Sequence, residues 1–315
     1  MRAIRVTQFG GPEALAYEEI EQPVPGAGQV LVRVGAAGVG PWDAWVRSGT
    51  SAVAHTLPLI PGADLSGVIE HVGPGAPFSA GDAVYGVTNA QFTGAYAEYA
   101  VANAAMIARK PTRLSFVEAA SVPVVATTAC QMLFDHGGLN ETTRVLVLGG
   151  AGNVGAYAVQ LAKRVAREVV ATAFSEDVEY VRGLGADRVI DVRAARTIGD
   201  VSDIDMIIDT AGGEALASWF AAMKPGGIVV SSVAQPDELE AARRGVRGVF
   251  FLVSVTSEGL ETISRLIDNG ELRTRVGEVL PLENARVAHE ILEGQRHTRG
   301  KIVLVMNPRA GDLAL

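Results

Sequence analysis

The chain has 315 residues, of which 48% are apolar and 20% charged, and its net charge is −8 with histidine counted as neutral. The length suggests about two domains, and the apolar content supplies ordinary hydrophobic cores, which excludes a disordered chain. The acidic balance disfavours a nucleic-acid or membrane-surface binder, because both need an excess of Lys and Arg.

The single cysteine, Cys130, excludes an internal disulfide and any zinc site that needs two or more cysteines. A reduced, cytoplasmic setting fits this cysteine content. The opening residues, MRAIRVTQFG, lack the apolar stretch of a signal peptide, and no run of about 18 apolar residues follows. We therefore expect a cytoplasmic protein without a membrane span.

Residues 1 to about 121 have the pattern of a β-rich domain. Short apolar runs alternate with breaks that carry Gly, Pro or Asp; the runs are RAIRVTQF, GQVLVRVGAAGV, LSGVIEHVG, DAVYGV and AEYAVA. Several short strands at this spacing predict a partly closed all-β unit.

From about residue 122 the pattern changes to alternating strands and helices. Six apolar runs predict strands, at 144–150, 167–174, 187–192, 203–213, 226–233 and 248–255. Helical spacing lies between them, at 153–166, 176–186 and 214–227, and a further helix is expected at 258–270. This alternation predicts a doubly wound parallel sheet with right-handed crossovers. After about residue 270 the pattern is mixed again, with strand and helix in 277–295 and a strand at 300–306.

The strongest chemical signal is the turn Gly150-Ala151-Gly152-Asn153-Val154-Gly155, which matches G-x-G-x-x-G. It follows a predicted strand and opens a predicted helix, which is the context that a dinucleotide-binding turn requires. Its glycines allow a tight turn, backbone approach to a pyrophosphate and close packing of helix on strand, while the helix N-terminus attracts the anion. The alternative is a glycine-rich turn without a ligand.

The choice between NAD and NADP depends on the end of the second strand, where an acid binds the ribose of NAD. The stretch that contains Thr172 and ends at Ser175 has no acid, and Glu176 and Asp177 follow in the next predicted helix. These two acids can instead complement the helix dipole, with Ser175 as the N-cap. The sequence therefore favours NADP(H).

The order of β-unit, nucleotide domain and mixed tail resembles the medium-chain dehydrogenase/reductase superfamily, in its zinc-free quinone oxidoreductase (zeta-crystallin-like) branch. The strings that carry the resemblance include GGPEAL, PLIPGADLSGVI, GAYAEYA, AASVPVVATTACQML, VLVLGGAGNVG, LGADRVID, MKPGGIVVS and RGKIVLVM. The resemblance implies an α/β chain with a GroES-like, partly open β-barrel catalytic domain at 1–121 and 262–315. A Rossmann domain at 122–261 completes it, and strands near 248–253 pair across a homodimer.

Zinc-dependent relatives place a cysteine and a His-Glu pair at positions that hold Gly40 and Ala63-Asp64 in this chain. A lone Asp64 cannot supply the three or four ligands of a zinc site. We therefore expect no metal, and hydride transfer that rests on placement and on hydrogen bonds to the developing oxyanion. Cys130, in an apolar helical run, is expected to be a buried, inert thiol rather than a nucleophile or ligand.

The resemblance places Asp43 and Arg47 in a substrate-side loop, where Gly40 and Trp45 replace the usual Asn and Tyr. Asp43 and Trp45 are the predicted catalytic residues. Asp43 has a structural alternative, in which it caps a helix at Ala44 and pairs with Arg47. The two tryptophans, Trp42 and Trp45, can form apolar walls of a substrate pocket or belong to the core.

Other cofactor contacts follow in part from the resemblance. Thr128 corresponds to a threonine near the nicotinamide amide, and Arg296 to a phosphate-contacting arginine. Ser231, Ser232 and Val233 end a predicted strand, where ligands collect. Phe251, Leu252 and Val253 correspond to a segment near the nicotinamide. Each of these residues also has a structural alternative. The Thr128 hydroxyl can bond within its own helix, and Arg296 can be a solvated surface residue. Phe251–Val253 can belong to the core or to a dimer edge. The relatives' phosphate-binding lysine is Val178 here, and Arg182 is a candidate substitute.

These features predict an NADPH-dependent, zinc-independent reductase of quinones or α,β-unsaturated carbonyls. Its partner is a small-molecule electrophile, with no nucleic acid and no membrane. Two alternatives remain open: an enoyl-thioester or haloacrylate reductase of the same fold, and a non-catalytic NADPH-binding sensor or structural protein.

Overall fold

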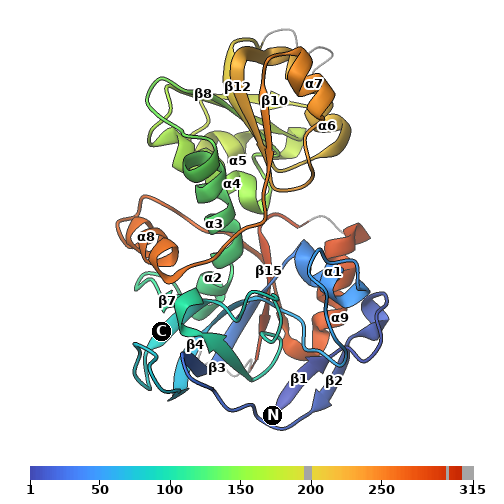
Figure 1. Ribbon diagram of the computed structural model, residues 1–315, viewed down its shortest axis with the longest axis vertical. Helices are drawn as coiled ribbons and strands as arrows, with labels where there is room; N and C mark the ends of the chain where they lie inside the picture. Colours follow the sequence, from blue (N-terminus) through green and yellow to red (C-terminus); the bar gives the residue numbers. More distant parts are fainter. Residues whose placement is uncertain (195–200, 296–297, 307–315) are drawn as a thin grey trace. The chain divides into compact units, whose positions relative to one another are not determined.

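The structure, a computed structural model, describes residues 1–194, 201–295 and 298–306 (Figure 1). Contacts within the chain divide it into two compact units. The first comprises Met1–Val124 with Ser254–Leu315, and the second is Val125–Val253. Within the described ranges, no helix has the length and apolar character needed to cross a membrane.

These boundaries lie near 121/122 and 261/262, the positions expected from the sequence, and the second lies eight residues earlier than expected (261 − 253). The helix expected at 258–270 is α8 (Ser257–Asp268), and it belongs to the first unit. The Tyr85 hydroxyl donates to the Leu260 carbonyl at 2.6 Å, and the Ser257 hydroxyl donates to the Ile107 carbonyl at 2.7 Å. The amphipathic pattern of residues 258–270 predicted the helix correctly but did not show which sheet it packs on.

The first unit is built on a seven-stranded sheet with the order β14-β15-β3-β4-β5-β7, in which β6 also pairs with β3. The strands are β3 (Gln29–Val39), β4 (Asp64–Val72), β5 (Ala83–Val87), β6 (Tyr99–Asn103), β7 (Ile107–Arg109), β14 (Val276–Pro281) and β15 (Lys301–Val305). A hairpin-like pair, β1 (Arg2–Arg5) and β2 (Ala16–Glu19), stands beside it as a separate sheet. The β-rich unit predicted from residues 1–121 is confirmed, and the C-terminal segment adds β14 and β15 to it. It is not all-β as expected, because two helices, at Pro41–Ser48 and Phe116–Ala120, lie within residues 1–121.

Four helices accompany this sheet: α1 (Pro41–Ser48), α2 (Phe116–Ala120), α8 and α9 (Ala285–Glu290). Apolar side chains of several strands meet in one core, including Val32, Leu65, Ile69 and Leu304, all at most 1% exposed. This core also encloses polar groups that belong to the candidate site, described below.

The second unit contains a six-stranded parallel sheet with the order β10-β9-β8-β11-β12-β13. The strands are β8 (Arg144–Leu148), β9 (Glu168–Ala173), β10 (Arg188–Asp191), β11 (Ile204–Asp209), β12 (Met223–Ser231) and β13 (Arg247–Phe250). They are connected through α4 (Asn153–Lys163), α5 (Val178–Gly183), α6 (Gly213–Trp219) and α7 (Glu238–Arg243). The predicted doubly wound sheet is confirmed, and its strand order reverses between β8 and β11.

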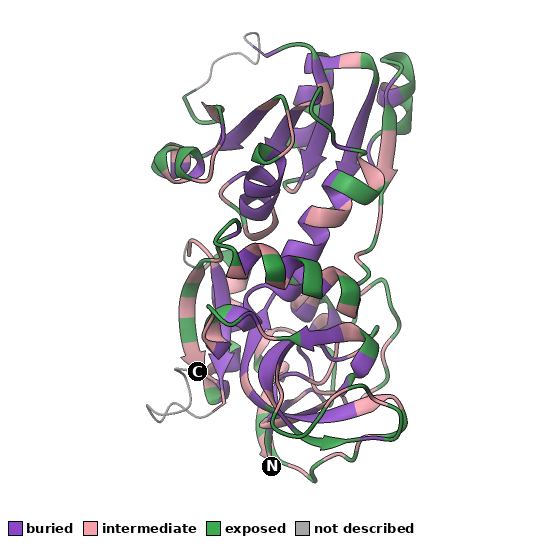
Figure 2. Ribbon diagram, turned by 90° about the vertical axis from the view of Figure 1, so that its left-hand side faces the viewer, coloured by how far each residue is buried: buried purple, intermediate pink, exposed green. Residues whose placement is uncertain are grey.

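Burial in this sheet follows the apolar runs of the sequence. The inner strands β8 and β11 are buried along most of their length, as the purple ribbon shows (Figure 2). The helix predicted at 214–227 is shorter than expected, since α6 ends at Trp219 and β12 begins at Met223. Pro225 has no N–H to donate and disfavours the helical conformation of the residue before it, so the chain becomes extended.

Candidate nucleotide-binding and reduction sites

The glycine turn joins β8 to α4 and is anchored to the neighbouring strand β9. The Gly149 N–H donates to the Thr172 hydroxyl at 2.9 Å, and the Gly150 N–H donates to the Thr172 carbonyl at 2.8 Å. The Gly152 N–H donates back to the Gly149 carbonyl at 2.9 Å, which closes the turn. Thr172, a predicted cofactor residue, therefore holds the turn in place.

Two glycines of the turn leave no room for a side chain. A Cβ atom on Gly155 would lie 2.1 Å from the Gly149 carbonyl oxygen, and one on Gly150 would lie 3.0 Å from the Ala171 Cβ. Gly152 is less confined, because its nearest neighbour would be the Gly149 carbonyl oxygen at 3.2 Å. The close approach of α4 to β8 thus depends on Gly155, and an added Cβ at Gly152 would be a tight contact rather than a clash.

Helix α4 begins at Asn153, with Gly152 as its N-cap. The N–H groups of Asn153, Val154 and Gly155 lie in the first turn, where a helix has no carbonyl four residues earlier to pair with them. Together with the positive end of the helix dipole, they form a cradle that suits a diphosphate. Gly150, Ala151 and Gly152 supply the backbone that lines it. The residues present therefore fit a dinucleotide cofactor.

The carboxyl ends of β11 and β12 lie on the other side of this turn in the sheet. Ser231 is fully buried and donates to the Asp209 carboxylate at 2.7 Å. The other carboxylate oxygen of Asp209 accepts from the Gly212 N–H at 2.8 Å. Ser232 and Val233 follow Ser231, and Val233 is 43% exposed. Ser231 thus shapes the strand end, while Ser232 and Val233 are the accessible positions there.

The remaining predicted cofactor residues are placed as follows. Thr128 is buried in α3 (Pro123–Cys130), and Ser175 opens a short 3₁₀ turn, Ser175–Asp177, before α5. Phe251, Leu252 and Val253 follow β13, where the Phe251 ring lies 4.3 Å from the His136 ring and Leu252 is 61% exposed. Arg296 lies outside the described residues. Ser175 is not the N-cap of a helix, because Phe174 precedes the 3₁₀ turn and α5 begins only at Val178.

The ends of β9 and β10 carry a side-chain group that the sequence did not single out. The Arg193 guanidinium lies over the Phe174 ring, 4.3 Å from its centroid, and contacts both oxygens of Glu176 at 2.9 and 3.0 Å. A hydrogen bond from Ser175 lowers the pKa of Asp191, whose carboxylate also accepts from the Arg193 N–H at 2.9 Å. The signal that could have revealed this group is an arginine just past the third strand of a Rossmann sheet.

In the first unit, the predicted catalytic Asp43 is the third residue of α1 and is fully buried. Its Oδ2 accepts from the Gly40 N–H at 2.8 Å and from the Tyr96 hydroxyl at 3.0 Å. Burial raises the pKa of Asp43 to about 7, against the opposing effect of the Gly40 hydrogen bond. Asp43 therefore titrates near neutral pH, and its bond with the Gly40 N–H caps the start of α1 from the third helical position.

Lys301, at the start of β15, is a second charged group inside this unit. Its ammonium is 3.0 Å from Asp64 Oδ2, with both side chains at most 2% exposed, and 4.1 Å from the centre of the Trp42 ring. Asp64 Oδ1 accepts from the Val124 N–H at 2.9 Å. We call Asp43, Asp64, Tyr96 and Lys301 the buried polar cluster. Its sequence signal was a lysine that opens the otherwise apolar run KIVLV.

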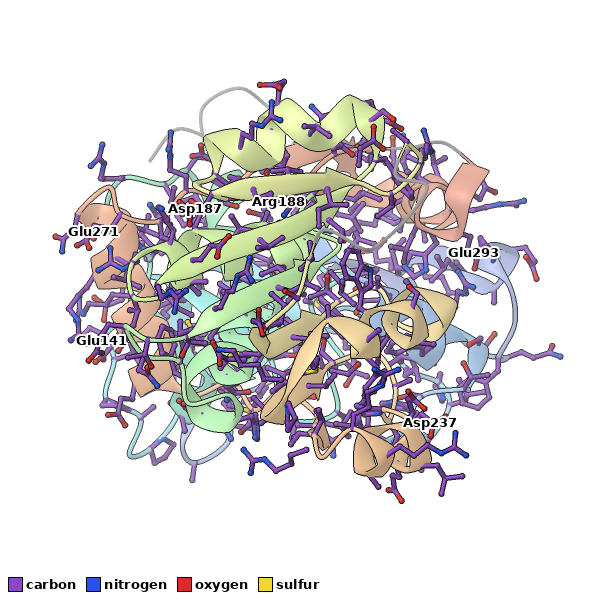
Figure 3. All side chains as sticks on the ribbon, turned by 90° about the horizontal axis from the view of Figure 1, so that it is seen from above. Glu141, Asp187, Arg188, Asp237, Glu271 and Glu293 are labelled. Carbon is purple, nitrogen blue, oxygen red and sulfur yellow. The ribbon has the colours of Figure 1, made fainter. Side chains whose placement is uncertain are left out.

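Arg47 does not pair with Asp43. Its guanidinium contacts His289 Nδ1 at 2.9 Å and forms an ion pair with Glu293, which is labelled in Figure 3. Burial and the nearby Arg47 charge lower the pKa of His289 to about 3, so this ring is neutral. The pairing expected for Arg47 within its own helix was wrong, because its side chain reaches α9 and the turn after it. Trp45, on the same helix, is 49% exposed.

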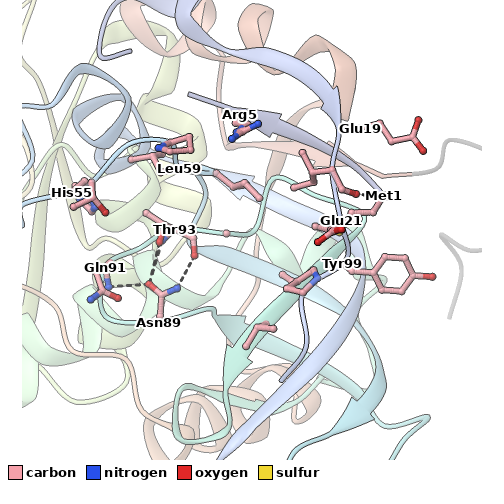
Figure 4. Close-up of a pocket in the computed structure, with 18 of the residues that line it drawn as sticks. Met1, Arg5, Glu19, Glu21, His55, Leu59, Asn89, Gln91, Thr93 and Tyr99 are labelled. Carbon is pink, nitrogen blue, oxygen red and sulfur yellow. Dashed lines mark hydrogen bonds between the residues drawn. The ribbon is translucent and has the colours of Figure 1, made fainter. Parts of the chain in front are cut away.

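A cavity of about 1030 Å³ opens on the first unit. Figure 4 shows His55, Asn89 and Gln91 at one end of it, and Glu19, Glu21 and Tyr99 at the other. Asn89 Oδ1 accepts from the Gln91 N–H at 2.9 Å, and this bond links two residues of the cavity wall. Asp43 and Trp45 are not among the described residues that line this cavity.

The residues present do not fit a zinc ion. Gly40 and Ala63 carry no ligand atom, and the carboxylate of Asp64 is already paired with the Lys301 ammonium. A Cβ atom on Gly40 would lie 2.3 Å from the Trp42 ring, so the indole fills the space beside it. Within residues 1–194, 201–295 and 298–306, no group of three or more His, Cys, Asp or Glu side chains could hold a metal ion.

A Rossmann sheet with a diphosphate cradle is typical of a dinucleotide-binding protein. Two family models match: the alcohol dehydrogenase GroES-like domain at residues 26–112 and zinc-binding dehydrogenase at residues 184–304. The chain belongs to the medium-chain dehydrogenase/reductase superfamily, in its quinone oxidoreductase branch. The family implies a nicotinamide dinucleotide cofactor.

Relatives match along nearly the whole chain. Human quinone oxidoreductase is 34% identical, over 97% of this chain and 98% of its own length. The structure of the quinone oxidoreductase from Coxiella burnetii superposes with a TM-score of 0.89 at 30% identity, covering 98% of this chain and 99% of that one. A solved NAD-dependent alcohol dehydrogenase has a TM-score of 0.86 at 32% identity, over 98% and 100% of the two chains.

Proposed function

We propose that this oxidoreductase transfers hydride from NADPH to a quinone or an α,β-unsaturated carbonyl compound, without a metal ion. The observation that carries the proposal is that Asp64 is paired with Lys301, whose ammonium lies over the Trp42 ring, so that the residues there do not fit a metal ion. The similarity to quinone oxidoreductases at 30–34% identity supports the substrate class.

The reduced nicotinamide supplies the hydride when it is bound. The chain's own residues bind and orient: the first-turn amides of α4 hold the diphosphate, and Thr172 fixes the turn that presents them. Electron-poor substrates suit a site without a Lewis acid, because a conjugated oxygen can carry the developing negative charge.

On the substrate side, we assign Trp45 as an apolar wall for a flat ring or enone, since its indole is half exposed on α1. Asp43 is fully buried, so it acts through its partners. It fixes Gly40 at the start of α1 and the Tyr96 hydroxyl, and it keeps a proton inside the unit near neutral pH. Asp43 is therefore assigned as a positioning residue for the helix that carries Trp45.

The experiment is to mix purified protein and NADPH with a panel of quinones, enones and enals, and to follow the loss of nicotinamide absorbance. We expect turnover that a strong chelator does not change, and a raised KM in Trp45→Ala that Trp45→Phe restores. Turnover confined to acyl thioesters would favour the enoyl-thioester alternative. Tight NADPH binding without turnover on any electrophile would contradict the proposal and favour a binding protein.

The proposal includes a homodimer. The last strand of the described Rossmann sheet is β13, whose outer edge offers N–H and C=O groups to a second copy, and Leu252 beyond it is 61% exposed. We expect light scattering to give a dimer mass, and Leu252→Asp to shift it toward the monomer. A wild-type monomer at micromolar concentration would contradict this part of the proposal.

A further inference from the structure

We propose that Arg193 is the residue that selects NADP(H), by exchanging the Glu176 carboxylate for the 2′-phosphate of the cofactor. The inference deepens the proposed use of NADPH and rests on it. Its elements are the Phe174 ring, the Arg193 guanidinium stacked on it and the Glu176 carboxylate that the guanidinium contacts through both oxygens.

The position of this group follows from the sheet. In a Rossmann sheet the adenosine ribose reaches the end of the strand that follows the glycine turn. Here that strand is β9, tied to the turn through Thr172, and Phe174 and Glu176 come directly after it. β10 runs parallel to β9 with Asp191 opposite Ala173, so Arg193 emerges at the same edge. Asp187 and Arg188, labelled in Figure 3, mark the opposite end of β10.

Glu176, the acid that could bind the hydroxyl groups of a ribose, is already paired with Arg193. In NAD-dependent Rossmann enzymes a carboxylate near this strand end accepts from the ribose 2′-hydroxyl. Glu176 follows the end of β9, and Arg193 compensates its charge. Asp177 beside it is buried, and Asp191 at the end of β10 accepts from the backbone N–H groups of Arg193 and Ala194.

The contact between Arg193 and Glu176 is suited to exchange. Their side chains are 58% and 45% exposed, so water screens the ion pair and makes it weak. A phosphate dianion offers three acceptor oxygens to the planar fork of a guanidinium, which binds them in a bidentate manner. The Phe174 ring, 46% exposed, stays in contact with the guanidinium at 4.3 Å while its partner changes. Val178 supplies no charge at the position of the relatives' lysine, and Arg182, the other candidate, is paired with Glu179 on α5.

The test uses two ligands that differ only in the 2′-phosphate: adenosine 2′,5′-bisphosphate and adenosine 5′-monophosphate. Calorimetry on the full chain measures binding without any hydride transfer. We expect the wild type to bind the bisphosphate about tenfold or more tightly than the monophosphate, and Arg193→Ala to lose this difference. Glu176→Gln should tighten bisphosphate binding, because it removes the competing carboxylate.

Arg182 on α5, the other candidate for the phosphate, is tested beside Arg193 through Arg182→Ala. The matched control is the ion pair of Arg286 and Glu290 on α9, so Arg286→Ala and Glu290→Gln should leave both affinities unchanged. Equal binding of the two ligands by the wild type would overturn the inference, as would an undiminished preference in Arg193→Ala or a loss in Arg182→Ala instead. Preference for the bisphosphate without quinone or enone turnover would leave the inference standing and refute the proposed reaction, so the two failures are distinguishable.

Discussion

The glycine turn of the second unit and the buried polar cluster of the first unit are built in opposite ways. The turn consists of backbone from six consecutive residues and is closed by hydrogen bonds at 2.8–2.9 Å. The cluster joins Asp43, Asp64, Tyr96 and Lys301, which are separated by up to 258 positions in the chain (301 − 43). The turn offers N–H groups to a ligand, whereas the cluster pairs Lys301 with Asp64 internally and leaves Asp43 Oδ1 without a hydrogen-bond partner among the described residues.

The two regions therefore respond to different kinds of mutation. A backbone cradle is sensitive to volume, because an added Cβ meets a carbonyl oxygen. A buried cluster is sensitive to charge, because removing one partner leaves the other ionised in a low-dielectric interior. Mutations that separate volume from charge therefore test whether the comparison is correct.

The largest effect is expected for Lys301→Met, which keeps much of the side-chain volume but removes the charge. Asp64 would remain buried without its counter-ion, and we expect a loss of about 3–5 kcal/mol in the free energy of unfolding. The control is Lys163→Met, which breaks the exposed pair with Asp187 and should cost at most about 1 kcal/mol. Urea denaturation compares the two variants, and equal losses would show that the cluster is not held by charge.

The next effect is a pH dependence that Asp43 imposes on stability. In the unfolded chain this carboxyl ionises with the ordinary aspartate pKa of 3.8, while in the folded protein burial raises its pKa to about 7. The stabilisation is therefore complete below pH 3.8 and is lost as the pH rises toward 7. We expect Asp43→Asn to gain on the wild type by on the order of 2–4 kcal/mol across that range.

The comparison with Asp43→Asn is made at each pH, so other titrating groups cancel. His289, with its pKa lowered to about 3, acts in the opposite sense and loses stabilisation as the pH falls, but it does so in both proteins. A difference between variant and wild type that stays constant from about pH 4 to pH 7 would mean that Asp43 is ionised in the folded state.

A smaller effect is expected for Gly155→Ala in the turn. The new Cβ would lie 2.1 Å from the Gly149 carbonyl oxygen, so α4 must move away from β8 at a cost of about 1–3 kcal/mol, with weaker nucleotide binding. The control is Gly183→Ala in α5, where no atom lies within 4 Å of the added Cβ and a gain of about 0.5–1 kcal/mol is expected. Similar stabilities of the two variants would show that the turn is not sensitive to added side-chain volume.

The same contrast explains what could be predicted from sequence. The turn, its strand and its helix are local in the chain, so the spacing of glycines and the apolar runs predicted them, together with the six-stranded sheet. The partners of Arg47 and Lys301 are not local: Glu293 and Asp64 lie 246 and 237 positions away (293 − 47 and 301 − 64). No periodicity connects such residues, and a helical i,i+4 rule pointed Arg47 toward Asp43 instead.

Arg193 stands between these two cases. It lies only two residues beyond β10, so its place at the strand edge could be read locally, but its contacts with Phe174 and Glu176 depend on the pairing of β10 with β9. Strand order was predictable from the doubly wound pattern, whereas the side chain that points back across the edge was not. For site residues that join two neighbouring strands, the position can thus be predicted from the sequence, but the side-chain contacts cannot.

The smallest effect is expected at Cys130, which belongs to neither region. Cys130 is only partly buried, not fully buried as expected, yet desolvation raises the pKa of its thiol to about 12. Almost no thiolate is therefore present at neutral pH, and alkylation should be on the order of 1,000-fold slower than for a free cysteine. Cys130→Ala should therefore change kcat/KM by less than about twofold. Iodoacetamide labelling followed by mass spectrometry checks the first expectation, and steady-state kinetics the second. Rapid labelling with loss of turnover would show that a side chain outside the turn and the cluster takes part in the reaction.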